Sequence, residues 1–210
     1  MEKRVTIIRH AVALKNLEDR HGGTGSNLAP IAVQEIQELV GHLKAKEIQA
    51  GTLFYSPVIH AEETAHFMAE LLSSRAEASH LIRPLNFGLV AGLRTAEVKV
   101  QFPDVADRLE QWRAGQLEAI DLDLPEAESF PEFWQRGITF LRCIPEGQNI
   151  VVGTRSVLVL LGNILRGRTL LRGGGYKEIP VKNCEFFTFE FSRGSWRFCQ
   201  NQSSPSKGRF

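Results

Sequence analysis

The pair Arg9 and His10 is the part of this chain best suited to chemistry on an anion. Arginine carries a permanent charge on forked donors that fit phosphate or carboxylate, and histidine can act as a nucleophile or carry a proton. The pair follows residues 5–8, an apolar and β-branched run that predicts a strand buried on both faces. Ligands of open α/β sheets bind at the carboxyl ends of strands, so an anion site is expected here. A purely structural pair, in which His10 ends the strand and Arg9 meets a surface acid, is the alternative.

Strands and helices alternate along the sequence that follows this pair. Apolar residues at helix spacing, among them Val33, Ile36 and Val40, predict a helix that begins at Pro30. The later segments expected are a strand over 52–55, a helix over 61–72, a helix over 132–144, a strand over 150–152, a helix over 157–165 and a hairpin over 185–199. Such alternation is typical of a parallel α/β sheet. Residues 83–124 have mixed periodicity, and the arginine- and glycine-rich residues 164–178 are expected to form a surface loop.

The composition fits one globular domain. The chain has 210 residues, of which 43% are hydrophobic, with 25 basic and 24 acidic side chains. This size allows a sizeable core, and the balanced charge gives no reason to expect nucleic acid or a membrane as a partner. No apolar run of about 18 residues and no signal-peptide pattern occurs, so a cytoplasmic location is expected. The three cysteines are widely spaced, so neither a disulfide framework nor a metal is expected, and no cofactor is expected. We expect a domain over 1–202 and a disordered tail over 203–210.

Four segments, in this order, resemble motifs of the histidine phosphatase superfamily, also called phosphoglycerate mutase-like. They are RHAVALKN at 9–16, SPVIHAEETA at 56–65, PEAES at 125–129 with Arg136, and IVVGTRSVLVLL at 150–161. The resemblance spans nearly the whole chain. It implies an α/β fold of one domain, a three-layer sandwich in which helices cover both faces of a mostly parallel central sheet.

The resemblance also implies a chemistry for the opening pair. In the family the first histidine attacks phosphorus and becomes phosphohistidine, while two arginines and a second histidine hold the phosphoryl oxygens and a carboxylic acid protonates the leaving group. Positioned cations of this kind stabilise the dispersed charge of a transferring phosphoryl group. By this resemblance His10 is the nucleophile, and Arg9 and Asn16 are phosphate ligands.

Other positions depart from the family pattern. His60 stands where the family has an arginine, Thr154 where it has the second histidine, and Pro84 where it has the acid. Loss of one such group typically costs on the order of a hundredfold in rate. The sequence therefore predicts a divergent member with a degenerate motif set, in which ordinary phosphomonoesterase activity is weak, lost or repurposed.

A rearranged site is an alternative. Arg155, which replaces a family glycine, could point inward and supply the charge missing at His60, and Thr154 could donate a hydroxyl hydrogen bond to the anion. For Arg155 an orientation toward solvent is favoured, and His60 is expected near the pocket on position alone. Three carboxylates are candidates for a substitute acid, none of them preferred: Glu62, Glu63 and Glu97.

Two classes of function stay open at this point. The first is an enzyme that acts on a phosphorylated or otherwise anionic small molecule through a phosphohistidine at His10. The second is a binding or regulatory pseudo-phosphatase that has kept the scaffold. Aromatic residues at Trp112, Phe130 and Trp134 could serve an interface or a pocket lid, so an oligomer is compatible with the sequence.

Overall fold

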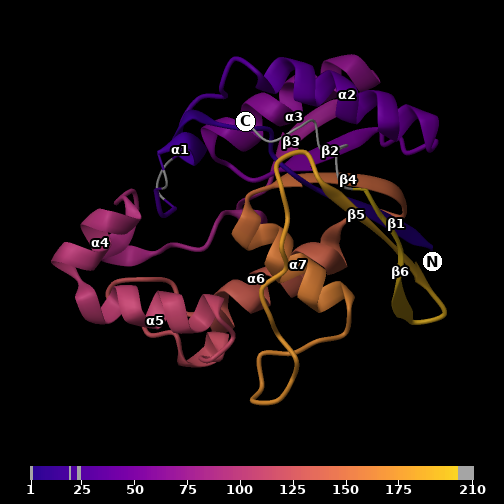
Figure 1. Cartoon of the computed structure of the whole chain (residues 1–210). Helices are drawn as coiled ribbons and strands as arrows, with labels where there is room; N and C mark the ends of the chain where they lie inside the picture. The colour runs from indigo at the N-terminus through magenta and orange to yellow at the C-terminus, as the bar shows by residue number, and fades with distance from the viewer. Residues whose placement is uncertain (1, 19, 23–24, 203–210) are drawn as a thin grey trace.

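A six-stranded sheet with the strand order β3-β2-β4-β1-β5-β6 forms the centre of the molecule (Figure 1). The computed structural model describes residues 2–18, 20–22 and 25–202, the side chains of 200–202 excepted, and the tail expected at 203–210 lies outside these residues. The strands are β1 (Lys3–Arg9), β2 (Thr52–Tyr55), β3 (Arg75–Ala78), β4 (Gly147–Gly153), β5 (Phe186–Ser192) and β6 (Ser195–Gln202). The first four strands are parallel, and β5 and β6 are antiparallel to their neighbours. The mostly parallel sheet and the final hairpin are confirmed.

Helices cover both faces of this sheet. The helices of the described residues are α1 (Leu14–Leu17), α2 (Ala32–Ala45), α3 (Ile59–Leu72), α4 (Thr95–Gln101), α5 (Pro103–Arg113), α6 (Phe130–Cys143) and α7 (Arg155–Leu165). Helices α2 and α3 lie on one side of the sheet, and α6 and α7 lie on the other (Figure 1). The three-layer α/β sandwich is therefore confirmed. Within the described residues, no helix is both long and apolar enough to cross a membrane.

Strand β1 alternates its side chains between the two layers. Val5 and Ile7 pack into the core under α6 and α7, whereas Ile8 packs into the core under α2 and α3. The polar Thr6 is buried as well, and its hydroxyl lies 3.1 Å from that of Thr188 on β5. A strand buried on both faces explains why the sequence shows an unbroken apolar run at 5–8.

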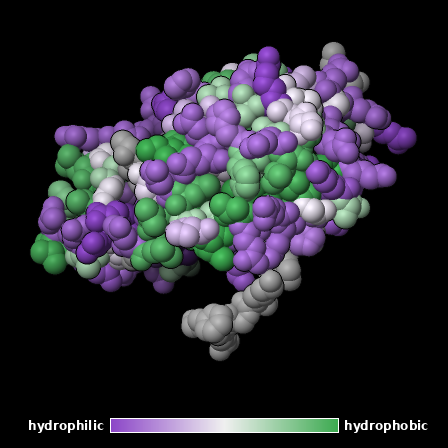
Figure 2. Space-filling view, turned by 90° about the horizontal axis from the view of Figure 1, so that it is seen from above, coloured by the Kyte–Doolittle hydropathy of each residue, from purple (hydrophilic) through white to green (hydrophobic). Residues whose placement is uncertain are grey.

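Polar and apolar side chains are mixed on the outer surface of the α2 and α3 layer (Figure 2). Ile36, Val40 and Leu43 of α2 are buried against the sheet, as their spacing predicts. Val33 is 51% exposed, so its assignment to the apolar face of this helix is wrong. The buried face of α2 begins instead at Ala32, which is one turn before Ile36 and is 0% exposed.

The mixed segment 83–124 contains two helices that extend beyond one end of the sheet (Figure 1). Pro103 interrupts the periodicity of the sequence, but it opens α5 because proline is well accepted at the first position of a helix. Strand β3 was not expected either, since its sequence RAEA has no apolar alternation and lies at the exposed edge of the sheet.

The motif residues Glu128 and Arg136 form a buried ion pair beside the segment that follows β3. Arg136 donates from Nε and Nη2 to the two carboxylate oxygens of Glu128, each at 2.7 Å, and from Nη1 to the carbonyl of Leu81 at 2.8 Å. Replacing Arg136 with methionine is expected to lower the free energy of unfolding by about 3 kcal/mol, because the Glu128 carboxylate stays buried with its main partner removed. Guanidinium denaturation measures this change.

The matched control is the exposed pair of Arg75 and Glu77 on strand β3, at 3.0 Å. Arg75→Met is expected to cost less than about 1 kcal/mol, since solvent screens this pair. Equal losses in the two variants would mean that the Glu128 pair contributes no more than a surface contact.

Candidate active site

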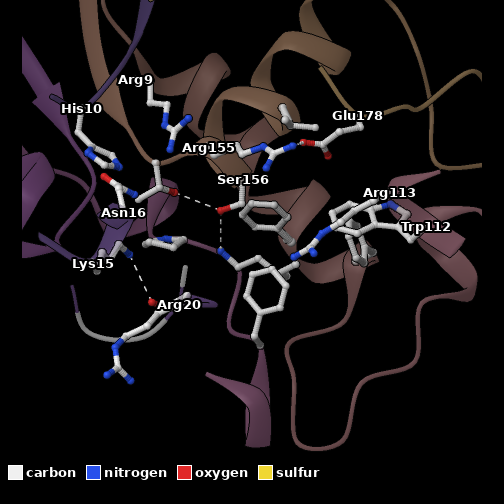
Figure 3. A pocket seen from close by; sticks show the side chains of 18 of the residues that line it. Arg9, His10, Lys15, Asn16, Arg20, Trp112, Arg113, Arg155, Ser156 and Glu178 are labelled. Atoms are coloured by element: carbon white, nitrogen blue, oxygen red, sulfur yellow. Dashed lines mark hydrogen bonds and ion pairs between the residues drawn. The ribbon is translucent and has the colours of Figure 1, made fainter. Parts of the chain in front are cut away.

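A cavity of about 340 Å³ opens at the carboxyl ends of β1 and β4 (Figure 3). Arg9 pairs in register with Gly153, so the residues that follow, His10 and Thr154, come together at this edge of the sheet. In Figure 3, His10, Lys15 and Asn16 lie at one end of the cavity, and Trp112 and Arg113 lie at the other. The size is in the range of small-molecule sites, and the two ends differ in chemistry. The first is polar and cationic, and the second is aromatic.

The His10 ring is fixed in one tautomer at the polar end. Its Nδ1 lies 2.7 Å from the carbonyl oxygen of Ala11, which can only accept, so Nδ1 carries the proton and donates. Nε2 is therefore the atom with a free lone pair. The side chain is 2% exposed, and burial lowers the pKa of His10 well below its usual value, with a further contribution from the neighbouring His60. A neutral imidazole with a defined Nε2 lone pair is the form required of a nucleophile.

His60 packs directly against His10 but does not line the cavity. The two ring centroids are 4.1 Å apart, and the His60 side chain is fully buried at the start of α3. Ser26 backbone lies beside the ring, yet within the described part of the chain no hydrogen bond of good geometry reaches either ring nitrogen. Burial and the nearby charge of Lys15 lower the pKa of His60 to about 3. His60 thus supports the His10 ring from behind as a neutral group.

Besides Arg113 at the aromatic end, four cationic side chains of the described residues line the cavity: Arg9, Lys15, Arg155 and Arg20, which is paired with Glu18. Arg9 donates to the carbonyl of Val181 at 2.6 Å, and burial together with the charge of Arg155 lowers the pKa of Arg9 to about 10. Lys15, on α1, donates to the carbonyl of Gly22 at 3.3 Å, and burial and Arg9 lower its pKa to about 8. These shifts arise because like charges are held together in a partly buried space. A bound anion would relieve this repulsion.

Arg155 lines the cavity and is also half exposed. Its Nη2 lies 2.7 Å from Oε1 of Glu178, and its side chain is 50% exposed. The side chain thus combines the two orientations considered from the sequence, since it lines the cavity and is also open to solvent. Glu178 lies 23 residues further along the chain, at the end of a segment expected to be a surface loop, so its influence on Arg155 could not be read from local sequence.

Polar groups with hydrogen-bonding capacity complete this end. Asn16 accepts a hydrogen bond from the backbone of Ala13 at 3.0 Å through Oδ1, which leaves its amide nitrogen as the donor on the cavity wall. Thr154 precedes the first turn of α7, and its hydroxyl lies 3.1 Å from that of Ser156 instead of capping the helix. The N–H groups of that turn add positive potential beside the cavity.

Carboxylic acids are scarce around the cavity. Pro84 lines it at the position where the resemblance leads one to expect an acid, and Glu178 is the one carboxylate among the described lining residues. The substitute acids considered from the sequence do not line it. Glu63 accepts from the backbone of Leu28 at 2.8 Å, and Glu97 accepts from the backbone of Arg94 at 2.6 Å. Glu62 is half exposed and faces His66.

Of the predicted site residues, Arg9, His10, Asn16, Thr154 and Arg155 line one cavity, and His60 lies behind it. Lys15, Tyr176 and Glu178 are among the cavity residues that sequence reasoning missed. Lys15 directly precedes Asn16 in the first motif. Treating every polar residue of that motif as a site candidate could have found it. Tyr176 and Glu178 reach the cavity because of the path that residues 164–178 follow in the fold. No local sequence pattern predicts this path.

A model of the histidine phosphatase superfamily (branch 1) matches residues 5–202 of the chain. None of the curated protein sequences is significantly similar to it. Among solved structures, Bacillus stearothermophilus YhfR superposes with a TM-score of 0.79 at 20% identity, over 93% of this chain and 95% of that one. A mycobacterial glucosyl-3-phosphoglycerate phosphatase gives 0.75 at 16% identity, over 94% and 97%. Phosphoglycerate mutase from Bacillus anthracis gives 0.76 at 18% identity, over 94% and 91%. At sequence identities of 16–20%, these superpositions show a shared fold only.

Proposed function

Because the chain belongs to the histidine phosphatase superfamily, branch 1, we propose that its cavity binds a phosphorylated small molecule and that His10 takes up the phosphoryl group. The observation that carries this proposal is the fixed orientation of His10. The Ala11 carbonyl holds Nδ1–H, so Nε2 is the basic atom of a neutral ring at the cationic end of the cavity. In the transfer step Nε2 would attack phosphorus, and the P–O bond to the leaving group would break with its electron pair on oxygen.

The cations suit the charge that this step moves. Arg9 lies at the cavity floor at the end of β1, and Lys15 approaches from α1. Both side chains are partly desolvated, so their attraction for a phosphoryl group is stronger than that of surface residues. We assign Lys15, Arg9 and the amide of Asn16 to the phosphoryl oxygens. Arg155 shares its charge with Glu178 and is assigned a weaker part.

The scarcity of acids supports a limit on this activity. An alkoxide leaving group needs a proton, whereas a group that is stable as an anion does not. Pro84 cannot donate a proton, and Glu178 is already paired with Arg155. Ordinary alkyl phosphates are therefore proposed to be turned over slowly.

Binding without turnover is the second candidate. The observation that favours it is the Arg155–Glu178 pair, which neutralises one cation and occupies the one described carboxylate of the cavity. A protein of this kind would hold the same phosphorylated ligand, and His10 would serve as a hydrogen-bonding group.

Anion binding tests what both candidates share, and its pH dependence tests the part played by Lys15. Sulfate keeps its charge throughout the neutral and alkaline range, so only the protein titrates. The pKa of Lys15 is about 8, and the charged form is the one that attracts the anion. Sulfate affinity, measured by calorimetry, is expected to be highest below this pKa and to fall roughly tenfold from about pH 7 to about pH 9.

Two variants separate Lys15 from the other cations. Lys15→Arg keeps the charge at all these pH values and is expected to remove the fall, whereas Lys15→Met is expected to bind weakly throughout. Burial and the charge of Arg155 lower the pKa of Arg9 only to about 10, so Arg9 does not account for a fall centred at pH 8. A wild-type affinity that is constant over this range would remove Lys15 from the phosphoryl site.

A further inference from the structure

The far end of the cavity is a wall of aromatic side chains. Trp112 comes from α5, Phe130 and Phe133 from α6, and Tyr176 from the segment that follows α7. The ring centroids of Trp112 and Phe130 are 5.7 Å apart, those of Phe130 and Tyr176 are 6.0 Å apart, and each pair meets edge to face. In Figure 3 Trp112 lies across the cavity from His10. A ligand held by its phosphoryl group at His10 would therefore direct the rest of its structure toward these rings.

The wall is held rigidly from behind. Phe133 is 1% exposed and Phe130 is 5% exposed, and Trp134 packs edge to face on the outer side of Tyr176 at 5.9 Å. Rings held in this way lose little conformational entropy when a ligand binds. Little of the free energy of their contacts with the ligand is therefore offset by ordering of the side chains. They also present fixed edges and faces, which a planar aromatic group matches better than a flexible chain.

A positioned guanidinium closes this end. Arg113 donates from Nη2 to Nδ1 of His21 at 3.1 Å, and the Nε2–H of His21 is then left to donate to the hydroxyl of Thr95, also at 3.1 Å. Because arginine can only donate, this chain of hydrogen bonds has one direction. It places a planar cation next to Trp112 at the cavity rim, where it can stack on an aromatic ring.

Hydrogen-bonding groups are few at this end. The described polar groups of the side chains there are the Arg113 guanidinium, the indole N–H of Trp112, the Tyr176 hydroxyl and Glu178, which is paired with Arg155. A sugar or polyol would leave most of its hydroxyl groups without partners against the rings, which is unfavourable. An aromatic group leaves none.

We propose that the phosphorylated ligand of this protein carries a planar aromatic group, which the Trp112, Phe130 and Tyr176 wall holds while the phosphoryl group lies at His10. This assignment of a ligand class rests on the proposed function, because it needs the phosphoryl group at the cationic end. The assignment goes beyond the proposed function because it states which class of phosphorylated molecule the cavity prefers.

Phosphonates test the assignment as binding alone, since their C–P bond is not an ester and no leaving group departs. The probes are sulfate, methylphosphonate, cyclohexylphosphonate, phenylphosphonate and naphthylphosphonate, measured by calorimetry at one neutral pH. Phenyl- and naphthylphosphonate are expected to bind about tenfold or more tighter than methylphosphonate, and severalfold tighter than cyclohexylphosphonate, whose ring is of similar size but not planar.

Two tryptophan variants supply the matched comparison. Trp112→Ala is expected to reduce the preference for naphthylphosphonate over methylphosphonate to within about twofold. Trp134→Ala removes a ring of the same kind that packs on Tyr176 without lining the cavity, and it is expected to keep most of the preference. Trp112→Phe, which disturbs the fold less, should show an intermediate preference.

The outcomes separate the two proposals. If sulfate and methylphosphonate bind but the aromatic phosphonates bind no tighter, the aromatic assignment is overturned and the phosphoryl site stands. Equal affinities for phenyl- and cyclohexylphosphonate would replace a planar group with a merely apolar one and would also overturn it. If neither sulfate nor any phosphonate binds, the proposed function fails and the aromatic assignment fails with it.

Discussion

Replacing His10 with alanine is expected to abolish the phosphorylated form of the protein and to slow the release of nitrophenolate from 4-nitrophenyl phosphate by at least about a thousandfold. The reason is that Nε2 of His10 is the atom that would bond to phosphorus, and His60 cannot take its place. The His60 ring is fully buried behind His10 and does not line the cavity. Rapid-quench single-turnover kinetics, with detection of acid-labile phosphate on the protein, measures both quantities.

His66→Ala is the control for this experiment. It removes an exposed histidine from α3, the helix that carries His60, and it should leave both readouts unchanged. If His10→Ala still released nitrophenolate at the wild-type rate, the cavity would not act through a phosphohistidine. If wild-type protein bound sulfate but never carried phosphate, the binding-only candidate would be the correct one.

The second large effect concerns the leaving group. The wild-type protein is expected to turn over an alkyl phosphate such as ethyl phosphate about a hundredfold to ten-thousandfold more slowly than 4-nitrophenyl phosphate, which is the contribution that a general acid typically makes. Nitrophenolate leaves without a proton, but ethoxide does not. The ratio of the two single-turnover rates measures this contrast.

A designed acid gives the converse test. Pro84 lines the cavity next to Leu85, so Pro84→Glu places a carboxyl group on the wall where the family has its acid. This variant is expected to raise the rate with ethyl phosphate about tenfold or more and to change the rate with 4-nitrophenyl phosphate much less. A small contrast in the wild type that becomes large in Glu178→Gln would instead identify Glu178 as an acid already in use.

The sheet and its layers could be predicted because their signals are local. The apolar run at 5–8 and the one at 150–152 each lie in strands buried on both faces, and the two strands are neighbours in the sheet. Strand β3 escaped prediction because an edge strand of polar residues has no pattern of burial to reveal it. Helices α4 and α5 escaped because they are short and meet at Pro103.

The site residues also fall into two groups: those that local sequence indicates and those that only the tertiary fold brings to the cavity. Arg9, His10 and Asn16 lie within one short segment, so motif and position together could indicate a shared pocket. The orientation of Arg155 depends on Glu178, and the aromatic wall depends on how α5, α6 and the segment up to Tyr176 pack. Such contacts between distant segments are decided by the tertiary fold, for which periodicity gives no information.

The register of β1 against β4 has a consequence for how the site forms. The pairing of Arg9 with Gly153 joins residues 144 positions apart, and it alone brings His10 beside Thr154 and Arg155. Closing a loop of this length is slow. The pairing of β1 with β4 becomes favourable only when the strands between them in the chain, β2 and β3, have also formed. We therefore expect the complete cationic end, with Arg155 beside Arg9, to form only when β1 and β4 have paired. An anion that binds at this end stabilises the native state relative to partly folded chains, because only the completed sheet forms the full site.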